Sequence, residues 1–302
     1  MYDIIGDVHG HADALENLLV KLGYHMVDGI YQHPDKRQLI FVGDLIDRGS
    51  QIRETLQLVK NMCDAGSAQV VMGNHEYNAI CFHTPHIEKG GFFRNHSLKE
   101  IKQHIRTLEQ FEGYEDEWEL YLAWFKTMPL FLELPHFNVV HAFWDEAHIT
   151  WIKKHYSKMD PSFLTMCCNQ DDRSGAYNII EQTLKGIETP LPVGITNPDK
   201  EGNHRKDCRV KWWMPLEARQ TMNDLLIPCP EVIKHQVIDQ DKTYAHYEGT
   251  KPVFFGHYAL KYRPVIENPL AICTDYNITH GGLLLACRVD IQNQSLTTEL
   301  IY

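Results

Sequence analysis

The sequence has few of the features that define specialised classes of protein. Its eight cysteines include no Cys-x-x-Cys pair, so neither a zinc ribbon nor a thioredoxin-like redox motif is supported. No apolar run reaches the roughly 18 residues of a membrane span, and there is no internal repeat or low-complexity linker. The chain starts with a short β-like run instead of a signal-peptide pattern, so we expect a cytoplasmic protein.

Net positive charge is also missing. The formal net charge of -11 opposes nonspecific binding to a phosphate backbone, which normally uses many Lys and Arg on one face, so no stable nucleic acid complex is expected. A phosphorylated substrate remains compatible, because bound metals can reverse the charge locally. The 302 residues, 43% hydrophobic and 23% charged, are typical of a globular protein that can bury a substantial core.

The most informative feature present is a set of three short motifs in the first quarter of the chain. They read Gly6-Asp7-Val8-His9-Gly10, Gly43-Asp44-Leu45-Ile46-Asp47-Arg48-Gly49 and Gly73-Asn74-His75-Glu76. Each follows an apolar run, at residues 2–5, 39–42 and 70–72, that is too short for a helix and typical of a buried parallel strand. Ligands bind beyond the carboxyl ends of such strands, so the three motifs are expected to converge on one site.

The remaining pattern predicts one domain over residues 1–302. Helical spacing after the first two motifs, at 11–22 and 52–62, indicates β-α-β units and a mainly parallel sheet at the start. A helical insertion is expected at about 83–128 and a larger insertion, covering one side of the site, at about 145–251. Further short strands are predicted at 130–134, 138–141, 253–255, 271–274, 282–289 and 296–301, and the closing ones suggest a second sheet layer.

The residue types in the motifs favour a dinuclear metal site. Asp7, His9 and Asp44 offer carboxylate and imidazole ligands, a mixture that suits manganese, iron or zinc better than calcium. Asp44 has two oxygens and could bridge a second ion, which Asn74 could bind through its amide oxygen. Two ions about 3.5–4 Å apart would activate a bridging water for in-line attack at phosphorus.

Three further residues of these motifs fit the rest of that chemistry. Arg48 carries a planar fork that matches phosphoryl oxygens. His75, next to Asn74, could protonate the leaving oxygen, and Asp47 could orient its imidazole and raise its basicity. Capping of a helix would explain one isolated Asp, but not the whole set of carboxylate, imidazole and amide after three strands.

In these three motifs the chain resembles the calcineurin-like metallophosphoesterases, and more narrowly their phosphoprotein phosphatase branch. Residues 2–82, 125–145 and 252–290 carry the resemblance, and the stretch 272–285 is also similar to symmetrical diadenosine tetraphosphate hydrolases. The resemblance implies an α/β (α+β) four-layer sandwich, with two packed mixed β-sheets flanked by helices.

The same resemblance implies a complete set of site residues. The first metal would be held by Asp7, His9 and Asp44, and the second by Asp44, Asn74 and two later histidines, which match His141 and His257 after apolar runs. Arg48 would bind phosphate, and His75 with Asp47 would form the acid dyad. Two divalent ions are implied, Mn²⁺ first, with Fe, Zn, Ni and Co as alternatives.

Departures from the family pattern narrow the expected reaction. The chain reads His141-Ala142-Phe143 instead of His-Gly-Gly, and Gly256-His257-Tyr258-Ala259 instead of Gly-His-x-His, so one imidazole is missing. The missing imidazole favours the phosphatase and tetraphosphate hydrolase branches over the phosphodiesterases. The tetraphosphate hydrolases often lack an acid at the position of Asp47, so its presence here favours the hydrolysis of monoesters. We therefore expect a phosphomonoesterase acting through a metal-bridging hydroxide. The alternatives are a dinucleoside polyphosphate or nucleotide hydrolase, and a noncatalytic binding protein, against which the intact ligand set argues.

Residues outside the motifs are open to two interpretations. Arg205 and Arg209 could add a second phosphate contact, or form a solvated basic turn before Trp212-Trp213, a pair expected in the core. The irregular spacing of a further histidine group favours a solvated loop over another metal site. This group comprises His83, His86 and His96.

Overall fold

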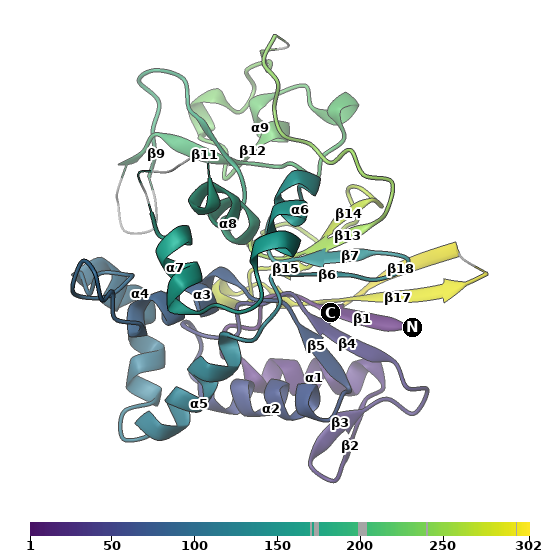
Figure 1. Cartoon of the computed structure of the whole chain (residues 1–302). Helices are drawn as coiled ribbons and strands as arrows, with labels where there is room; N and C mark the ends of the chain where they lie inside the picture. The colour runs from purple at the N-terminus through teal and green to yellow at the C-terminus, as the bar shows by residue number, and fades with distance from the viewer. Residues whose placement is uncertain (170, 172–174, 199–203, 240, 294) are drawn as a thin grey trace.

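The computed structural model describes residues 1–169, 171, 175–198, 204–239, 241–293 and 295–302, and two mixed sheets form its centre (Figure 1). The first sheet has the order β18-β17-β1-β4-β5, in which β1, β4 and β5 are parallel and β17 and β18 antiparallel. Its strands are β1 (Tyr2–Ile5), β4 (Gln38–Phe41), β5 (Ala68–Val70), β17 (Ala286–Gln292) and β18 (Ser295–Ile301). The three strands that precede the motifs are therefore parallel neighbours, as predicted.

The second sheet has the order β14-β13-β7-β6, with β7, β13 and β14 parallel and β6 antiparallel. Its strands are β6 (Phe131–Glu133), β7 (Asn138–Val140), β13 (Val253–Phe255) and β14 (Ala271–Cys273). The apolar runs 138–141 and 253–255 thus end at the same sheet edge, and each is followed directly by a histidine.

Alternation of side chains along the strands packs the two sheets against each other. On β1, Ile4 belongs to a buried cluster with Phe137 and Phe254 of the second sheet, whereas Ile5 faces the opposite side. Because successive strand residues point to opposite faces, each central strand has one apolar face between the sheets and one towards helices.

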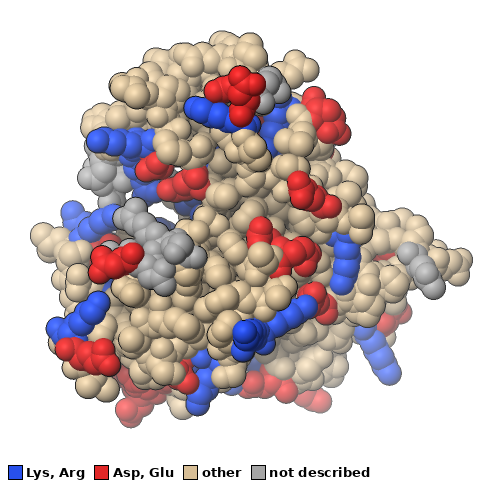
Figure 2. Space-filling model, turned by 45° about the horizontal axis from the view of Figure 1, so that its top comes forward, with Lys and Arg blue, Asp and Glu red and all other residues tan. Residues whose placement is uncertain are grey.

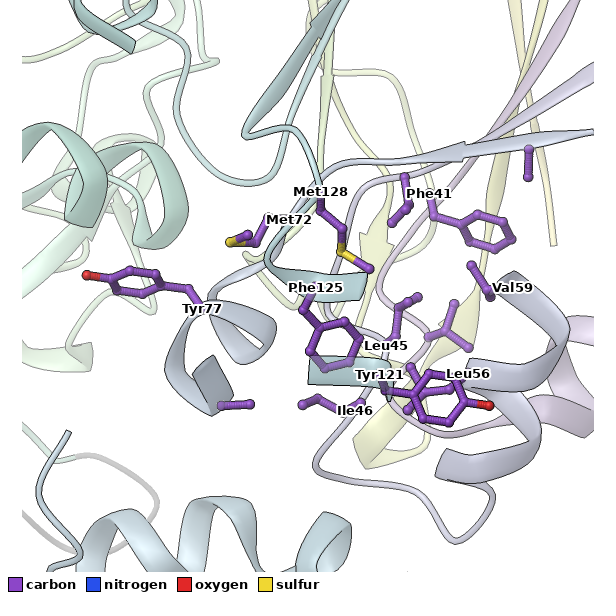
Figure 3. Close-up of a cluster of buried hydrophobic side chains, with 14 of the residues drawn as sticks. Phe41, Leu45, Ile46, Leu56, Val59, Met72, Tyr77, Tyr121, Phe125 and Met128 are labelled. Atoms are coloured by element: carbon purple, nitrogen blue, oxygen red, sulfur yellow. The ribbon is translucent and has the colours of Figure 1, made fainter. Parts of the chain in front are cut away.

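Helices complete the outer layers. Against the first sheet lie α1 (Ala12–Leu22) and α2 (Ile52–Asp64), and Figure 3 shows Leu56 and Val59 of α2 close to Phe41 of β4. On the outer face of the second sheet, Ile149 of α6 (Glu146–His155) shares a buried cluster with residues of β7 and β13. The predicted four-layer sandwich is confirmed.

The sequence suggested that the closing strands form a second sheet layer together. In the structure they are divided between the two sheets. The runs 253–255 and 271–274 join the second sheet, but β17 and β18 return to the first, where Tyr2 of β1 lies opposite Val289 of β17. The run 282–289 is also divided, into β16 (Leu283–Leu284) and β17. The local sequences of these strands are alike, so only their long-range pairing decides which sheet each one joins.

The two predicted insertions surround the carboxyl ends of the strands. The first contains α4 (Leu98–Gln110) and α5 (Glu115–Phe125), which follow α3 (Asn74–His83). The larger insertion has a small core of its own around Leu191, Val210 and Leu225. Its elements include α7 (Pro161–Cys167), α8 (Ala176–Lys185), β8 (Glu188–Pro190), β9 (Asn197–Pro198), β10 (His204–Arg205), β11 (Asp207–Val210), α9 (Met222–Leu225) and β12 (Leu226–Ile227).

Two further pairs of short strands lie outside both the central sheets and the insertions among the described residues. They are β2 (His25–Val27), β3 (Ile30–Gln32), β15 (Asp275–Tyr276) and β16. In the part of the chain that the structure describes, no helix is both long and apolar enough to cross a membrane.

Candidate functional site

The candidate ligands come from five loops that leave the strands at one edge of the sandwich. Asp7 and His9 follow β1, Asp44 follows β4, and Asn74 opens α3 after β5. His141 and His257 follow β7 and β13 in the same way. Except for His141, which is fully buried behind the others, all of these residues line a cavity of about 640 Å³.

Four of the candidate ligands meet at one point. The amide oxygen Oδ1 of Asn74 lies 2.7 Å from Nδ1 of His257 and 3.1 Å from Nε2 of His141. Nε2 of His141 is in turn 3.4 Å from Oδ1 of Asp44. Atoms that share one cation at bond lengths of about 2.0–2.2 Å have separations of this size. Asp44, Asn74, His141 and His257 therefore fit the set expected for one of two metals.

The hydrogen bonds of the His141 imidazole show why a cation fits between His141, Asn74 and Asp44. Nδ1 of His141 lies 2.7 Å from the carbonyl oxygen of Val42, which can only accept, so this nitrogen donates. In the neutral ring, Nε2 then directs its lone pair at two oxygens, Oδ1 of Asn74 and Oδ1 of Asp44, neither of which donates. A bound cation would relieve this repulsion.

The imidazole of His9 is prepared in the same way. Its Nδ1 donates to the carbonyl oxygen of Ile46 at 2.7 Å, which leaves Nε2 facing Oδ2 of Asp44 at 3.6 Å. Burial, followed by the charge of His75, lowers the pKa of His9 to about 3, so the ring is neutral at physiological pH, as a metal ligand must be. Asp44 has one oxygen towards His9 and the other towards His141, as a bridging carboxylate would.

Asp7 lies at the edge of this cluster, beside a carboxylate to which the sequence had assigned no role. Its side chain accepts the backbone N–H of His257 at 3.0 Å and contacts Asp275, which is also buried. Burial and then the negative charge of Asp275 raise the pKa of Asp7. Asp275 follows β14, so the same strand-end rule that found the other ligands would have indicated it.

Asp275 also contacts the position where many metallophosphoesterases have another imidazole. Its Oδ2 accepts the backbone N–H of Ala259 at 2.5 Å. A carboxylate therefore lies close to Asp7 in a chain that lacks a histidine at 259. Gly256 is required nearby, because a Cβ at that position would lie 2.0 Å from Oδ1 of Asp7.

The backbone at the site is held in unusual conformations. Four of the predicted site residues have left-handed φ angles: His9 at 49°, Asp44 at 54°, Asp47 at 82° and His257 at 72°. For residues other than glycine such conformations cost about 1–3 kcal/mol each and persist only where the surrounding structure determines them. They direct these side chains towards the same small volume.

Glu76 supplies part of that constraint. Its Oε2 accepts the backbone N–H groups of Asp44 at 2.9 Å and Gly73 at 3.0 Å, and its Oε1 accepts that of Leu45 at 2.8 Å. Glu76 is the third residue of α3 and fully buried, so it caps the helix and joins the second and third motifs. The motif was recognised from the sequence, but this role of its last residue was not.

The two residues predicted as an acid dyad, His75 and Asp47, are in contact. Nδ1 of His75 lies 2.5 Å from Oδ2 of Asp47, and Nε2 of His75 faces the metal cluster, 3.8 Å from Oδ2 of Asp44. The other oxygen of Asp47 accepts from Nδ1 of His104 at 2.6 Å and from the hydroxyl of Thr107 at 2.7 Å. Burial alone would raise the pKa of Asp47, but His104 and His75 outweigh it and hold the pKa well below its usual range.

His104 connects the dyad to two further rings. The indole N–H of Trp118 donates to Nε2 of His83 at 3.2 Å, and Nε2 of His104 lies 3.1 Å from the same nitrogen. Because Nδ1 of His104 contacts Asp47, side chains from α4 and α5 support the dyad.

The solvated loop expected around three histidines is observed only in part, since His86 and His96 lie in a loop with exposed residues after α3, whereas His83 does not. His83 ends α3 and packs against Trp118 and His104, and burial, then the charge of His104, lowers its pKa to about 4. His96 stacks on Phe82 with ring centroids 3.8 Å apart. The spacing gave no sign of these contacts, because α4 and α5 bring the partners from distant parts of the chain.

The three candidate phosphate-binding arginines all line the cavity. Arg48 is exposed to it, and among the described residues no carboxylate lies within ion-pair distance of its guanidinium. Arg209, on β11, donates from Nη1 to the carbonyl oxygen of His257 at 3.5 Å, and Arg205 pairs with Glu188 at 3.9 Å. Trp212 and Trp213 are fully buried, as expected of core residues.

Comparison with known proteins agrees with this geometry. Among curated relatives, the bis(5'-nucleosyl)-tetraphosphatase PrpE (asymmetrical) of Oceanobacillus iheyensis is 34% identical over 140 residues, 46% of this chain and 54% of the relative. The enzyme of the same name from Halalkalibacterium halodurans is 53% identical over 74 residues, 24% of this chain and 30% of that one. The matched segments thus span about half or less of these relatives' length.

Solved structures with a related arrangement include a protein serine/threonine phosphatase from Saccharomyces cerevisiae. It is 17% identical, with a TM-score of 0.49 over 99% of this chain and 78% of that one. The family model of the calcineurin-like phosphoesterases matches residues 2–174, more than half of the chain. The chain therefore belongs to the calcineurin-like phosphoesterase family.

Proposed function

We propose that this chain is a dinuclear metal-dependent phosphatase that hydrolyses phosphomonoesters. The observation that carries the proposal is the 2.5 Å contact between His75 and Asp47 beside the converging ligand set. A monoester with an alkoxide leaving group needs a proton donor, and a buried imidazole held by a carboxylate can provide one. A noncatalytic binding protein would have no need for this dyad.

Each residue then has a defined task. Asp7, His9 and Asp44 would hold one cation, and Asp44, Asn74, His141 and His257 would hold the other. When bound, two divalent cations, Mn²⁺ by preference, supply a reactive water at neutral pH and neutralise charge on the phosphoryl group. Arg48 binds phosphoryl oxygens, and Nε2 of His75 keeps the proton that passes to the leaving oxygen, while Asp47 orients the ring.

A second candidate substrate class is dinucleoside polyphosphates. The cavity extends beyond the cluster to Arg94, Lys99 and Lys185, which would suit further phosphates of a longer substrate. The relatives named as bis(5'-nucleosyl)-tetraphosphatases support the same class. On the face shown in Figure 2, basic and acidic side chains are interspersed without a broad basic patch, which favours a small phosphorylated substrate or phosphopeptide over nucleic acid.

The larger insertion at about 145–251 is proposed to act as a cap within a single domain. It supplies Cys168, Tyr177, Lys185, Arg205 and Arg209 to the wall of the cavity. These residues lie opposite the motif loops, so the insertion is placed to choose among phosphorylated substrates. The family motifs do not constrain this part of the wall.

The deciding experiment is a substrate panel on one Mn²⁺-loaded preparation. It compares p-nitrophenyl phosphate, phosphopeptides, mononucleotides and diadenosine tetraphosphate. A folded, metal-loaded protein that fails on all monoesters would refute the leading proposal.

Asp44→Asn should abolish binding of the second ion, measured by metal analysis, and a variant that still binds two ions would refute the bridging role.

A matched pair of variants separates the two substrate classes. Lys99→Met removes a cation from the cavity wall, whereas Lys102→Met changes an exposed lysine of the same helix outside the cavity. If longer phosphates are bound there, Lys99→Met should lower kcat/KM for diadenosine tetraphosphate by about tenfold and leave p-nitrophenyl phosphate unchanged. Equal effects of the two variants would remove Lys99 from substrate binding.

A further inference from the structure

Two cysteines from distant parts of the chain meet in the wall of the cavity. Cys81 lies on α3, the helix that begins with Asn74 and His75, and Cys168 follows α7 in the larger insertion. Their sulfur atoms are 3.7 Å apart although 87 residues separate them in sequence. A disulfide bond is about 2.0 Å long, so the sulfurs need to approach each other by less than about 2 Å.

The surroundings differ for the two sulfurs. Cys81 is only 3% exposed, whereas Cys168 is partly exposed, and both line the cavity. The hydroxyl of Tyr77 lies 3.3 Å from the sulfur of Cys168, on the same side as Cys81. A small oxidant that enters the cavity therefore reaches Cys168 first, with Cys81 directly behind it.

The more accessible thiol, Cys168, is also the more acidic of the two. The pKa of Cys168 is lowered, chiefly by the hydrogen bond to Cys81, whereas burial raises the pKa of Cys81. The neighbouring Cys167 is fully buried in the apolar core, and burial raises its pKa as well. Because the thiolate is the reactive form, Cys168 is the more reactive member and Cys81 is placed to resolve its oxidised form.

We propose that Cys81 and Cys168 are an oxidative modification site that forms a reversible disulfide with hydroperoxides. The Cys168 thiolate attacks the peroxide O–O bond, which gives a sulfenic acid and releases water or an alcohol. The Cys81 sulfur then attacks the sulfenic sulfur, the S–S bond forms, and the oxygen leaves as water. Overall, two thiols are oxidised, one peroxide is reduced, and an external thiol reverses the bond.

The bond would join the two halves of the cavity wall. It links α3, which carries Asn74 and His75 at its first turn, to the insertion that covers the opposite side. In the reduced form, the contact between Tyr77 on α3 and Cys168 after α7 is a noncovalent one between side chains. The disulfide therefore limits relative movement of cap and site, whatever substrate the cavity accepts.

The test is a peroxide titration of the reduced wild-type protein. Aliquots are alkylated, digested without reductant and analysed by mass spectrometry, and free thiols are counted in parallel. We expect the thiol count to fall from eight to six, the difference being two, with a linked peptide pair that contains Cys81 and Cys168. Dithiothreitol should restore all eight. A dominant Cys167–Cys168 bond, or sulfinic acid at Cys168 without a linked peptide, would overturn the proposal.

Variants provide the matched control. Cys168→Ser should abolish the fast loss of thiols, and Cys81→Ser should limit it to one thiol and abolish the linked peptide pair. Cys63→Ser, which changes a partly buried cysteine away from the cavity, should do neither. In the wild type, Cys168 should react at least about tenfold faster than Cys63, because it is partly exposed in the cavity wall and its thiolate is the more accessible. Equal rates at the two positions would refute the assignment without the need for any variant.

Discussion

His104 and Asp47 lie 2.6 Å apart, between Nδ1 of the imidazole and Oδ1 of the carboxylate. The other oxygen of Asp47 contacts His75 at 2.5 Å, so one buried carboxylate is shared between two rings. His104 comes from α4 of the helical insertion, and the motifs give no indication of it. It contacts neither the expected substrate position nor a metal ligand, and is therefore a positioning residue.

Removing this support should slow turnover without weakening substrate binding. In His104→Ala, Asp47 loses a hydrogen-bond donor and can rotate away from His75, so we expect kcat to fall about tenfold, or about 1.4 kcal/mol, with KM little changed. His104→Asn keeps an N–H near the position of Nδ1 and should restore part of the loss. Steady-state kinetics tests this, and a raised KM at constant kcat would contradict it.

The acid role of His75 predicts a dependence on the leaving group. His75→Asn should lower turnover strongly for alkyl phosphates, whose leaving groups need a proton, and only weakly for p-nitrophenyl phosphate. The comparison is made on one metal-loaded preparation, with metal content measured in both proteins because His75 adjoins Asn74. Equal losses for both substrates would remove His75 from proton transfer.

Glu76 should matter for stability. In Glu76→Gln, the amide group places N–H donors against backbone N–H groups of Asp44, Leu45 or Gly73. A buried donor without a partner costs about 1–3 kcal/mol, so the free energy of unfolding should fall by that amount in urea titrations. Glu109→Gln, at an exposed pair with Arg106, is the matched control and should change stability by less than about 0.5 kcal/mol.

Stability should also fall in mild acid because of His83. Its pKa is lowered to about 4 in the folded protein from 6.5, chiefly by burial and then by His104. Between these values the unfolded chain takes up a proton that the folded protein does not, so stability is fully present above pH 6.5 and decreases as the pH falls towards 4. Unfolding titrations across this range should show a loss of roughly 1–3 kcal/mol that His83→Asn reduces. The exposed His25→Asn should leave the slope unchanged.

The sequence alone was sufficient for the sandwich and for the strand ends at which the candidate metal ligands lie. Asp7, Asp44 and Asn74 each follow a short apolar run, and the pairing of β1, β4 and β5 as parallel neighbours brings them to one edge. The carboxyl ends of parallel strands lie at the same edge of a sheet, so residues that follow such strands lie close together. The family motifs then indicated His141 and His257 from more distant strands.

The tertiary structure decided everything that depends on contacts between distant segments. The return of β17 to β1, the packing of His104 on Asp47, the position of Asp275 beside Asp7 and the meeting of Cys81 with Cys168 have no local signature. Each joins residues whose separation in sequence is set by loops of variable length, so no periodicity can reveal it. The convergence of the candidate ligands was therefore predictable from strand ends, whereas their supporting partners and the cavity wall required the fold.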